Sequence, residues 1–164
     1  MSFAIFSDSS CNLPKAQLEE FQVQIISSSY EREGKLITCP PYPEDFDGHE
    51  YYNFLRNKGV VKTSLIPATQ MEDAFRPVLA AGEDVLYITL SSGISGTVAS
   101  GLQAAQALME EFPQRQVRVL DSMGAGFGIG LLLGRASDDR KAGLNLDQTY
   151  ASLERDRDNL CEFF

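Results

Sequence analysis

One run of residues, 84–90, constrains the fold of this chain more than any other stretch. It reads Asp84-Val85-Leu86-Tyr87-Ile88-Thr89-Leu90 and is almost continuously apolar, which predicts a strand buried on both faces. Apolar residues then recur at helical spacing from Val98 to Phe112. Between the two patterns lies Leu90–Thr97, a stretch rich in serine and glycine. The sequence therefore predicts that a buried strand turns directly into a helix at this point.

The same alternation of strand and helix patterns extends along the chain. A small hairpin is expected over 30–38, around Glu33-Gly34-Lys35. The other strand-like runs lie at 3–6, 23–26, 60–64 and 117–120. Strands that alternate with helices indicate an α/β fold, with a mostly parallel sheet flanked by helices in a Rossmann-like, three-layer arrangement. A length of 164 residues fits one domain with a substantial core.

Hydroxyl and carboxyl side chains follow four of the predicted strands. They are Asp8-Ser9-Ser10, Thr63-Ser64, Ser91-Ser92 and Asp121-Ser122. The carboxyl ends of parallel strands meet at one edge of a sheet, where ligands usually bind, so we expect these groups to converge. The helix that follows Ser95 adds unpaired N–H groups and the positive end of its macrodipole, which together suit an anion. Ser95 or Thr97 acting only as a helix N-cap remains the alternative.

Composition excludes several classes of partner. A net charge of −9 argues against binding a nucleic-acid backbone, which requires clustered lysine and arginine. The chain contains no apolar run of the roughly 20 residues that span a bilayer, and its N-terminus lacks the pattern of a signal peptide. Cys11, Cys39 and Cys161 are widely spaced, with neither CxxC spacing nor histidine partners. Reduced thiols in a cytoplasmic protein, without a metal site, are therefore expected.

Two kinds of catalytic or cofactor site are weaker alternatives. Gly93-Ile94-Ser95-Gly96-Thr97 approaches the GxSxG elbow of a serine esterase, but Thr97 stands where that motif needs glycine. The single histidine, His49, lies upstream of Ser95, against the order of that fold. Glycines at 124, 126, 128 and 130 follow a late strand with GxGxGxG spacing, which differs from a dinucleotide fingerprint. A glycine-faced helix packed close to its neighbour is the preferred interpretation of those glycines.

A non-catalytic carboxylate site fits these residues better. Hydroxyl groups and helix-start amides donate hydrogen bonds to a carboxylate, at about 1.5–3 kcal/mol for each bond to a charged acceptor. Tight binding then requires apolar burial, which contributes about 0.8 kcal/mol per CH₂ group. A long acyl chain supplies that burial, whereas a small acid does not.

The same residues resemble the signature blocks of the DegV family of fatty-acid-binding proteins. The matching blocks are Asp8-Ser9-Ser10-Cys11-Asn12-Leu13-Pro14, Lys62-Thr63-Ser64, Leu90-Ser91-Ser92-Gly93-Ile94-Ser95-Gly96-Thr97 and Asp121-Ser122. Two departures are visible, because Asn12 stands where aspartate is common and Leu65-Ile66-Pro67 replaces a usual Gln-Pro.

The resemblance implies a binding site for one long-chain fatty acid, such as palmitate, stearate or oleate. By motif position, Thr63 and Ser95 would hydrogen-bond its carboxylate, with Ser64, Gly96 and Ser92 close by. The residues expected to support this rim are Asp8, Ser9, Ser10, Asp121 and Ser122. No cofactor or metal is implied.

The resemblance also implies a partner and a domain organisation. Bacterial members present the bound acid to a separate, dihydroxyacetone-kinase-like fatty-acid kinase, which phosphorylates the carboxyl group, so no catalysis is expected here. Family members have two domains, and residues 1–160 match the N-terminal one. The apolar run Leu160-Cys161-Glu162-Phe163-Phe164 breaks off abruptly, so 161–164 are interpreted as the start of a missing C-terminal domain. The basic groups that the family supplies from its second domain would then be absent.

Overall fold

A computed structural model describes residues 3–162, and a four-stranded parallel sheet forms its centre. The strand order is β2-β1-β6-β7, and all three pairings are parallel. The bounds of these strands are Phe3–Asp8 for β1, Val23–Ile26 for β2, Asp84–Thr89 for β6 and Val117–Asp121 for β7. The predicted α/β fold with a mostly parallel sheet is confirmed.

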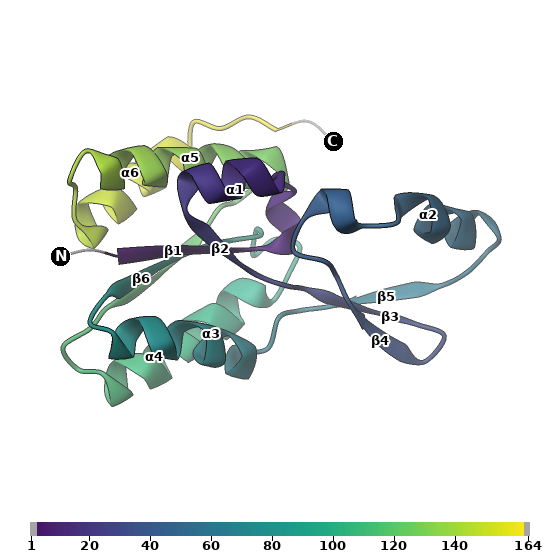
Figure 1. The fold of residues 1–164 in the computed structure, drawn as a ribbon, viewed down its shortest axis with the longest axis horizontal. Coiled ribbons are helices and arrows are strands. Elements are labelled where there is room, and N and C mark those ends of the chain that lie inside the picture. The colour runs from purple at the N-terminus through teal and green to yellow at the C-terminus, as the bar shows by residue number, and fades with distance from the viewer. Residues whose placement is uncertain (1–2, 163–164) are drawn as a thin grey trace.

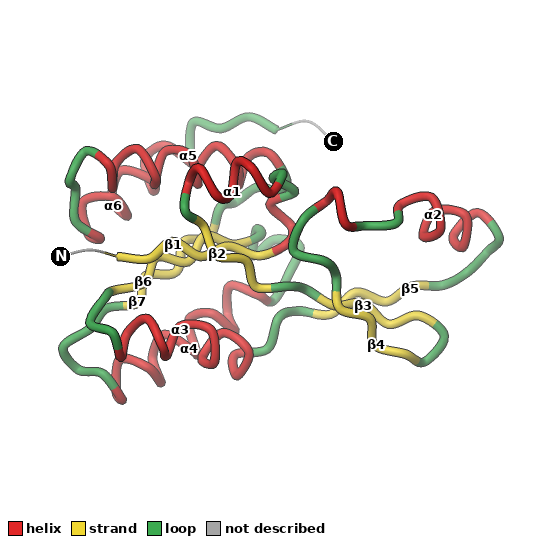
Figure 2. Tube along the Cα trace, viewed as in Figure 1, coloured by secondary structure: helices red, strands yellow, loops and turns green. Residues whose placement is uncertain are grey.

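Helices cover both faces of this sheet and make three layers (Figures 1 and 2). One face carries α1 (Lys15–Phe21), α5 (Phe127–Lys141) and α6 (Leu146–Arg157). The opposite face carries α3 (Ala68–Ala80) and α4 (Thr97–Glu111). None of the helices within residues 3–162 is long and apolar enough to cross a membrane.

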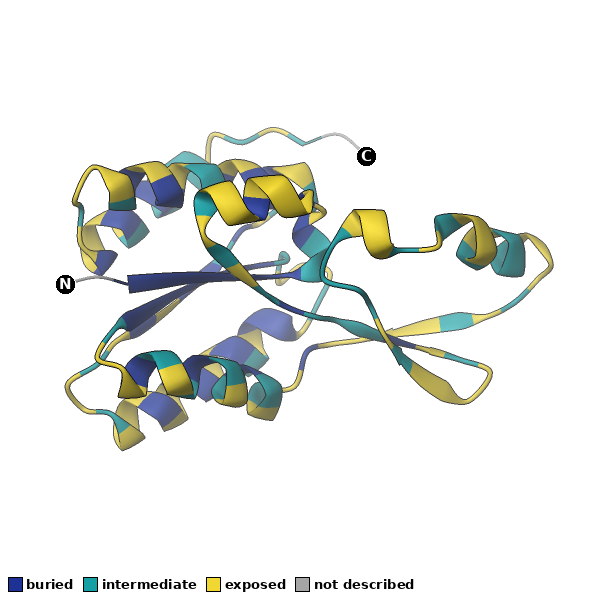
Figure 3. Cartoon of the chain, viewed as in Figure 1, coloured by how far each residue is buried: buried dark blue, intermediate teal, exposed yellow. Residues whose placement is uncertain are grey.

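Alternation along the central strands explains why both faces need a cover. Phe3 and Ile5 of β1 pack into the core beneath α1, α5 and α6, whereas Ala4 and Phe6 pack toward α3 and α4. Every residue of β1 and β6 is buried, as the dark strands at the centre of Figure 3 show. A strand buried on both faces requires the continuous apolar run seen in the sequence.

A second, antiparallel sheet projects from the first, with strand order β4-β3-β5 (Figure 1). Its strands are β3 (Ser29–Arg32), β4 (Lys35–Thr38) and β5 (Val61–Ser64), and α2 (Gly48–Arg56) lies beside it. The predicted hairpin over 30–38 is present as β3 and β4.

The position of β5 corrects one expectation. Thr63 and Ser64 were expected to follow a strand of the parallel sheet, but they lie within β5 and pair antiparallel with Tyr30 and Ser29. The physical reason lies in their environment: Lys62, Thr63 and Ser64 are exposed. A strand with so little apolar surface cannot occupy the interior of a two-sided sheet.

The remaining features of the fold are two short 3₁₀ turns and the close packing of α5 against Leu13. Residues Ser9–Cys11 and Pro43–Asp45 form single 3₁₀ turns. The glycine-rich helix α5 begins only at Phe127, because Met123 and Gly126 before it have positive φ angles, which a right-handed helix does not allow. A Cβ atom at Gly130 would lie 2.8 Å from Leu13 Cδ2, which accounts for glycine on this face. Phe163 and Phe164, which belong to the proposed start of a second domain, lie outside the described residues.

Candidate functional site

A cavity of about 560 Å³ opens at the carboxyl edge of the parallel sheet. From β1 the chain passes to β2 on one side, and β6 then pairs with β1 on the other side. The cavity is lined by residues that follow β1 and β6, the two strands at which the order reverses. Ligand sites in open α/β sheets lie at this kind of topological switch point.

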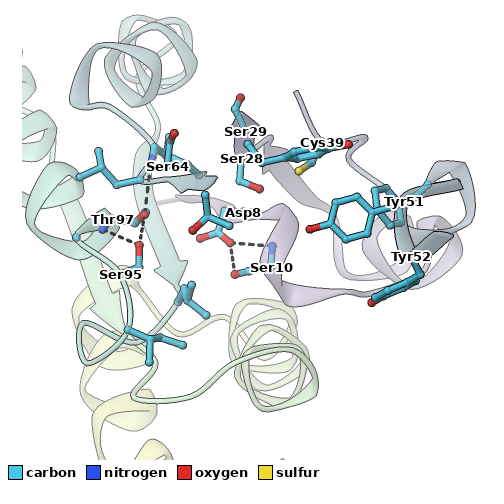
Figure 4. A pocket seen from close by; sticks show the side chains of 18 residues that line it. Asp8, Ser10, Ser28, Ser29, Cys39, Tyr51, Tyr52, Ser64, Ser95 and Thr97 are labelled. Atoms are coloured by element: carbon cyan, nitrogen blue, oxygen red, sulfur yellow. Dashed lines mark hydrogen bonds between the residues drawn. The ribbon is translucent and has the colours of Figure 1, made fainter. Parts of the chain in front are cut away.

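The lining combines two kinds of side chain, some of which Figure 4 labels. Hydroxyl and carboxyl groups come from Asp8, Ser10, Ser28, Ser29, Thr63, Ser64, Ser95 and Thr97. Mainly apolar or aromatic surface comes from Tyr30, Phe46, Tyr51, Tyr52, Leu65, Ile66, Leu90 and Ile94. A lining of this composition can bind a ligand that carries both a polar group and apolar atoms.

Ser95 and Thr97 form a hydroxyl pair at the start of α4. Their Oγ and Oγ1 atoms lie 2.8 Å apart, and the Thr97 N–H donates to Ser95 Oγ at 3.2 Å. Thr97 Oγ1 also accepts from the Ile66 N–H, at a long 3.4 Å. Thr97 is buried and Ser95 is half-buried. The less buried of the two hydroxyls is therefore the one more accessible to a ligand.

Asp8 places a buried carboxylate on another part of the wall. Its Oδ1 atom accepts from the Ser10 N–H at 2.9 Å and from the Ser10 hydroxyl. Its Oδ2 atom accepts from the Tyr87 hydroxyl at 3.2 Å and from Thr89 Oγ1 at 2.5 Å. All four donors are neutral, and together they occupy about four acceptor positions, which is what an ionised carboxylate provides. Burial, and then the negative charge of Asp8, raise the pKa of Tyr87 well above its usual value.

The second sheet and α2 supply the remaining wall. Rings of Tyr30 and Tyr51 contact edge to face, with centroids 5.4 Å apart. Arg32 of β3 pairs with Glu50 of α2 at 2.6 Å, and its guanidinium lies 3.8 Å from the centroid of the Phe54 ring. Sequence analysis did not place these aromatic residues at the site. The aromatic run from Phe46 to Tyr52 was visible, but nothing local to it indicates which cavity it faces.

The predicted site residues separate into two groups. The structure brings six of them to the cavity, namely Asp8, Ser10, Thr63, Ser64, Ser95 and Gly96. The lining of this cavity does not include Ser9, Ser92, Asp121 or Ser122.

The residues outside the lining bond to one another and to nearby groups near the same sheet edge. Ser9 Oγ lies 2.7 Å from Ser28 Oγ, and Asp121 Oδ1 accepts from the Ser92 N–H at 3.2 Å. Ser122 Oγ donates to the Gly124 carbonyl at 3.1 Å. These contacts shape the turns beside the cavity.

The neighbours of Ser95 bear on its chemistry. Nucleophilic catalysis requires a base within hydrogen-bond reach of the hydroxyl. Among the lining residues of the described chain there is no histidine or lysine, and His49 instead contacts Asn53 on α2 at 3.2 Å. The geometry thus provides hydrogen-bond donors and acceptors around a partly apolar cavity.

Comparison with known proteins gives a consistent family relationship. A family model described as "Uncharacterised protein, DegV family COG1307" matches residues 2–164. A DegV domain-containing protein of Clostridium perfringens is 29% identical over 99% of this chain and 55% of its own length.

Two solved structures are similar in fold as well as in sequence. One, a fatty-acid-binding DegV family protein from Thermus thermophilus, is 28% identical with a TM-score of 0.83, over 96% of this chain and 54% of that chain. The other, a stearic acid-binding protein from Eubacterium ventriosum, is 26% identical with a TM-score of 0.82, over 93% and 52% respectively. The chain spans about half the length of the curated relatives it matches.

Proposed function

Because this chain belongs to the DegV family, we propose that it binds one long-chain fatty acid in the cavity at the switch point of its parallel sheet. The observation that carries the proposal is a single cavity whose lining combines hydroxyl groups with apolar and aromatic side chains. Two solved relatives of matching fold bind a fatty acid, in one case stearic acid, which supports the same ligand class here.

We assign the carboxylate of the ligand to Thr63 and Ser95. Both line the cavity, one from β5 of the antiparallel sheet and one from the turn before α4, so together they would hold the ligand between two parts of the fold. Ser64 and Gly96 lie next to them in the lining, and Ser92, Asp121, Ser122 and Ser9 would act only through the surrounding turns. Each bond to the charged carboxylate contributes about 1.5–3 kcal/mol.

The acyl chain would lie against the apolar part of the lining. Tyr51 and Tyr52 of α2 offer apolar surface there. Burial at about 0.8 kcal/mol per CH₂ makes palmitate, stearate or oleate far better ligands than short acids.

We further propose that the protein presents the acid to a separate, dihydroxyacetone-kinase-like kinase in the bacterial cytoplasm and does not itself catalyse a reaction. The motif resemblance supports the kinase partner, and the three free cysteines suit a reducing compartment. The half-buried position of Ser95 also leaves the bound carboxyl group near the surface, where a partner could reach it.

Binding can be tested by calorimetry on the 164-residue chain with saturated acids from C8 to C18. Affinity should rise by roughly tenfold for each two CH₂ groups, as far as the cavity can bury them. Thr63→Val and Ser95→Ala should weaken binding by about tenfold or more without changing the circular dichroism spectrum. Ser100→Ala, on the same helix but outside the lining, is the matched control. Failure to bind any of these acids would refute the proposal.

The esterase alternative predicts a different result. If Ser95 were a nucleophile, p-nitrophenyl acyl esters would be hydrolysed and Ser95→Ala would abolish the reaction. We expect only background hydrolysis that is the same in both proteins, because the structure places Thr97 rather than a base beside Ser95.

A further inference from the structure

The hydroxyl pair at the start of α4 contains more hydrogen-bonding groups than a simple helix cap needs. Thr97 Oγ1 lies between two partners, Ser95 Oγ at 2.8 Å and the Ile66 N–H at 3.4 Å. Ser95 Oγ in turn receives the Thr97 N–H at 3.2 Å. Three groups are thus linked in series, from the backbone after β5 to the hydroxyl that faces the cavity.

The direction of the protons along this series follows from burial. The Ile66 N–H can only donate, so one lone pair of Thr97 Oγ1 is occupied. If the Thr97 hydroxyl donates to Ser95 Oγ, then Ser95 accepts two bonds and its own proton is left for the cavity. In the opposite arrangement Ser95 would donate to Thr97, and the Thr97 hydroxyl proton would need another acceptor. Thr97 is only 4% exposed, so water is a poor source of that acceptor. Buried hydroxyl groups are hydrogen-bonded, so the first arrangement is the stable one.

We propose that Thr97 is a positioning residue that makes Ser95 a committed hydrogen-bond donor toward a bound carboxylate. The inference rests on the proposed function, because it assigns a role within the same site. Thr97 acts through Ser95: it fills the acceptor positions of the serine oxygen and leaves its O–H for the ligand. A donor oriented before binding spends less conformational entropy when the ligand arrives.

The same series also connects the two walls of the cavity. Ile66 follows β5 of the antiparallel sheet, whereas Thr97 begins a helix of the main domain. The bond between them therefore joins the two parts of the fold that line the cavity.

A set of substitutions at Thr97 separates this role from simple packing. Thr97→Val keeps the shape but removes the hydroxyl. We expect palmitate to bind about tenfold more weakly, because the Ser95 hydroxyl is no longer held as a donor toward the ligand. Thr97→Ser restores the hydroxyl and should bind within about threefold of wild type. Thr149→Val is the matched control, because Thr149 is a fully buried threonine on α6 whose Oγ1 has no hydrogen-bond partner among residues 3–162. It should leave binding unchanged.

A double-mutant cycle tests whether Thr97 acts through Ser95. With Ser95→Ala already present, adding Thr97→Val should weaken binding no further than about threefold. The carboxyl ¹³C resonance of [1-¹³C]palmitate should shift on going from wild type to Thr97→Val, and return with Thr97→Ser. Urea unfolding of each variant checks that the fold is retained. If Thr97→Val unfolds the chain, Thr97→Cys replaces it, and because the S–H group is a weak donor we expect the same weaker binding of palmitate.

The outcomes distinguish the two proposals. If wild type binds palmitate and Thr97→Val binds equally well, the role of Thr97 is overturned and the fatty-acid site stands. Additive losses in the double mutant would likewise overturn it, because they would mean that Thr97 contacts the ligand directly. Failure of the wild-type chain to bind palmitate at all would overturn both.

Discussion

At the scale of single residues, the cavity wall combines two hydroxyl networks of opposite character. Around Ser95, the bond direction that we propose for the pair with Thr97 leaves the serine proton for the ligand. Around Asp8 they point the other way, because the Ser10 and Thr89 hydroxyls both lie within hydrogen-bond reach of the carboxylate. A ligand carboxylate is attracted to the first network and repelled by the charge of the second. The bound carboxylate is therefore expected on the Ser95 side of the cavity.

Asp8→Asn should separate the contribution of this carboxylate to folding from its effect on binding. The amide cannot accept at all four positions, so we expect urea unfolding to show a loss of about 1–3 kcal/mol. Removing a negative charge from the wall should at the same time leave palmitate affinity unchanged or improve it. Asp121→Asn, at the end of the neighbouring strand and outside the lining, should change neither quantity by as much. Weaker binding by Asp8→Asn would contradict the assignment of the carboxylate to the Ser95 side of the cavity.

At the scale of elements, α2 is the part of the cavity wall held by the fewest contacts. It contains no buried residue and is joined to β3 by side chains, chiefly the Arg32–Glu50 pair and the aromatic contacts of Tyr51 and Phe54. Elements with few buried contacts open locally at low free energy. The helix that carries Tyr51 and Tyr52 is thus the most easily displaced part of the site.

Arg32→Ala should loosen α2 without unfolding the domain. The substitution removes both the ion pair with Glu50 and the stacking on Phe54. We expect faster hydrogen exchange across α2, weaker palmitate binding by a few-fold, and an unchanged urea midpoint for the parallel sheet. Arg76→Ala breaks an ion pair with Glu111 on the opposite side of the domain and should leave exchange in α2 as it was. Equal exchange in the two variants would show that the pair does not hold α2.

The glycines of α5 provide a second prediction at this scale. A Cβ atom at Gly130 would lie 2.8 Å from Leu13, whereas at Gly134 the closest atom is the end of the half-buried Phe21 ring at 3.3 Å. Gly130→Ala should therefore lower the free energy of unfolding by about 1–3 kcal/mol through overpacking. Gly134→Ala should be neutral or stabilising by up to about 1 kcal/mol, since alanine favours a helix. Equal urea midpoints for the two variants would contradict the close-packing explanation.

At the scale of the whole molecule, features that leave a local pattern in the sequence were predicted, whereas features that depend on long-range contacts were missed. The parallel core was predictable because β1 and β6 are buried on both faces and display this as continuous apolar runs. The hairpin was predictable from its turn. The sheet to which β5 belongs was not predicted, because the polarity of this four-residue strand excludes only the interior of the parallel sheet and does not identify the strand with which it pairs.

The candidate site was likewise predicted only in part. Its serine and threonine residues were found because they lie in short motifs, and six of the predicted residues do line one cavity. The wall formed by Tyr30, Phe46, Tyr51 and Tyr52 depends on how α2 packs against the antiparallel sheet. That packing is a long-range contact with no local pattern in the sequence.

The buried ionisable groups predict how the whole molecule responds to alkaline pH. Burial raises the pKa of the Cys11 thiol, and burial together with Asp8 raises that of the Tyr87 hydroxyl. In the unfolded chain these groups lose their protons near their ordinary values, about 8.5 for cysteine and 10 for tyrosine. Above those values the unfolded state binds fewer protons than the native state, so the free energy of unfolding must fall as the pH rises.

Urea unfolding between about pH 8 and pH 11 measures this dependence. The midpoint should begin to fall near pH 9 and fall more steeply above about pH 10, when Tyr87 joins Cys11. Tyr87→Phe should remove much of the steeper part, leaving a smaller slope from Tyr30 and Tyr150, whose pKa values burial also raises. Tyr52→Phe, at an exposed ring, should leave the profile unchanged. If Tyr87→Phe retained the full slope, the buried contact between Tyr87 and Asp8 would not be the source of the alkaline instability.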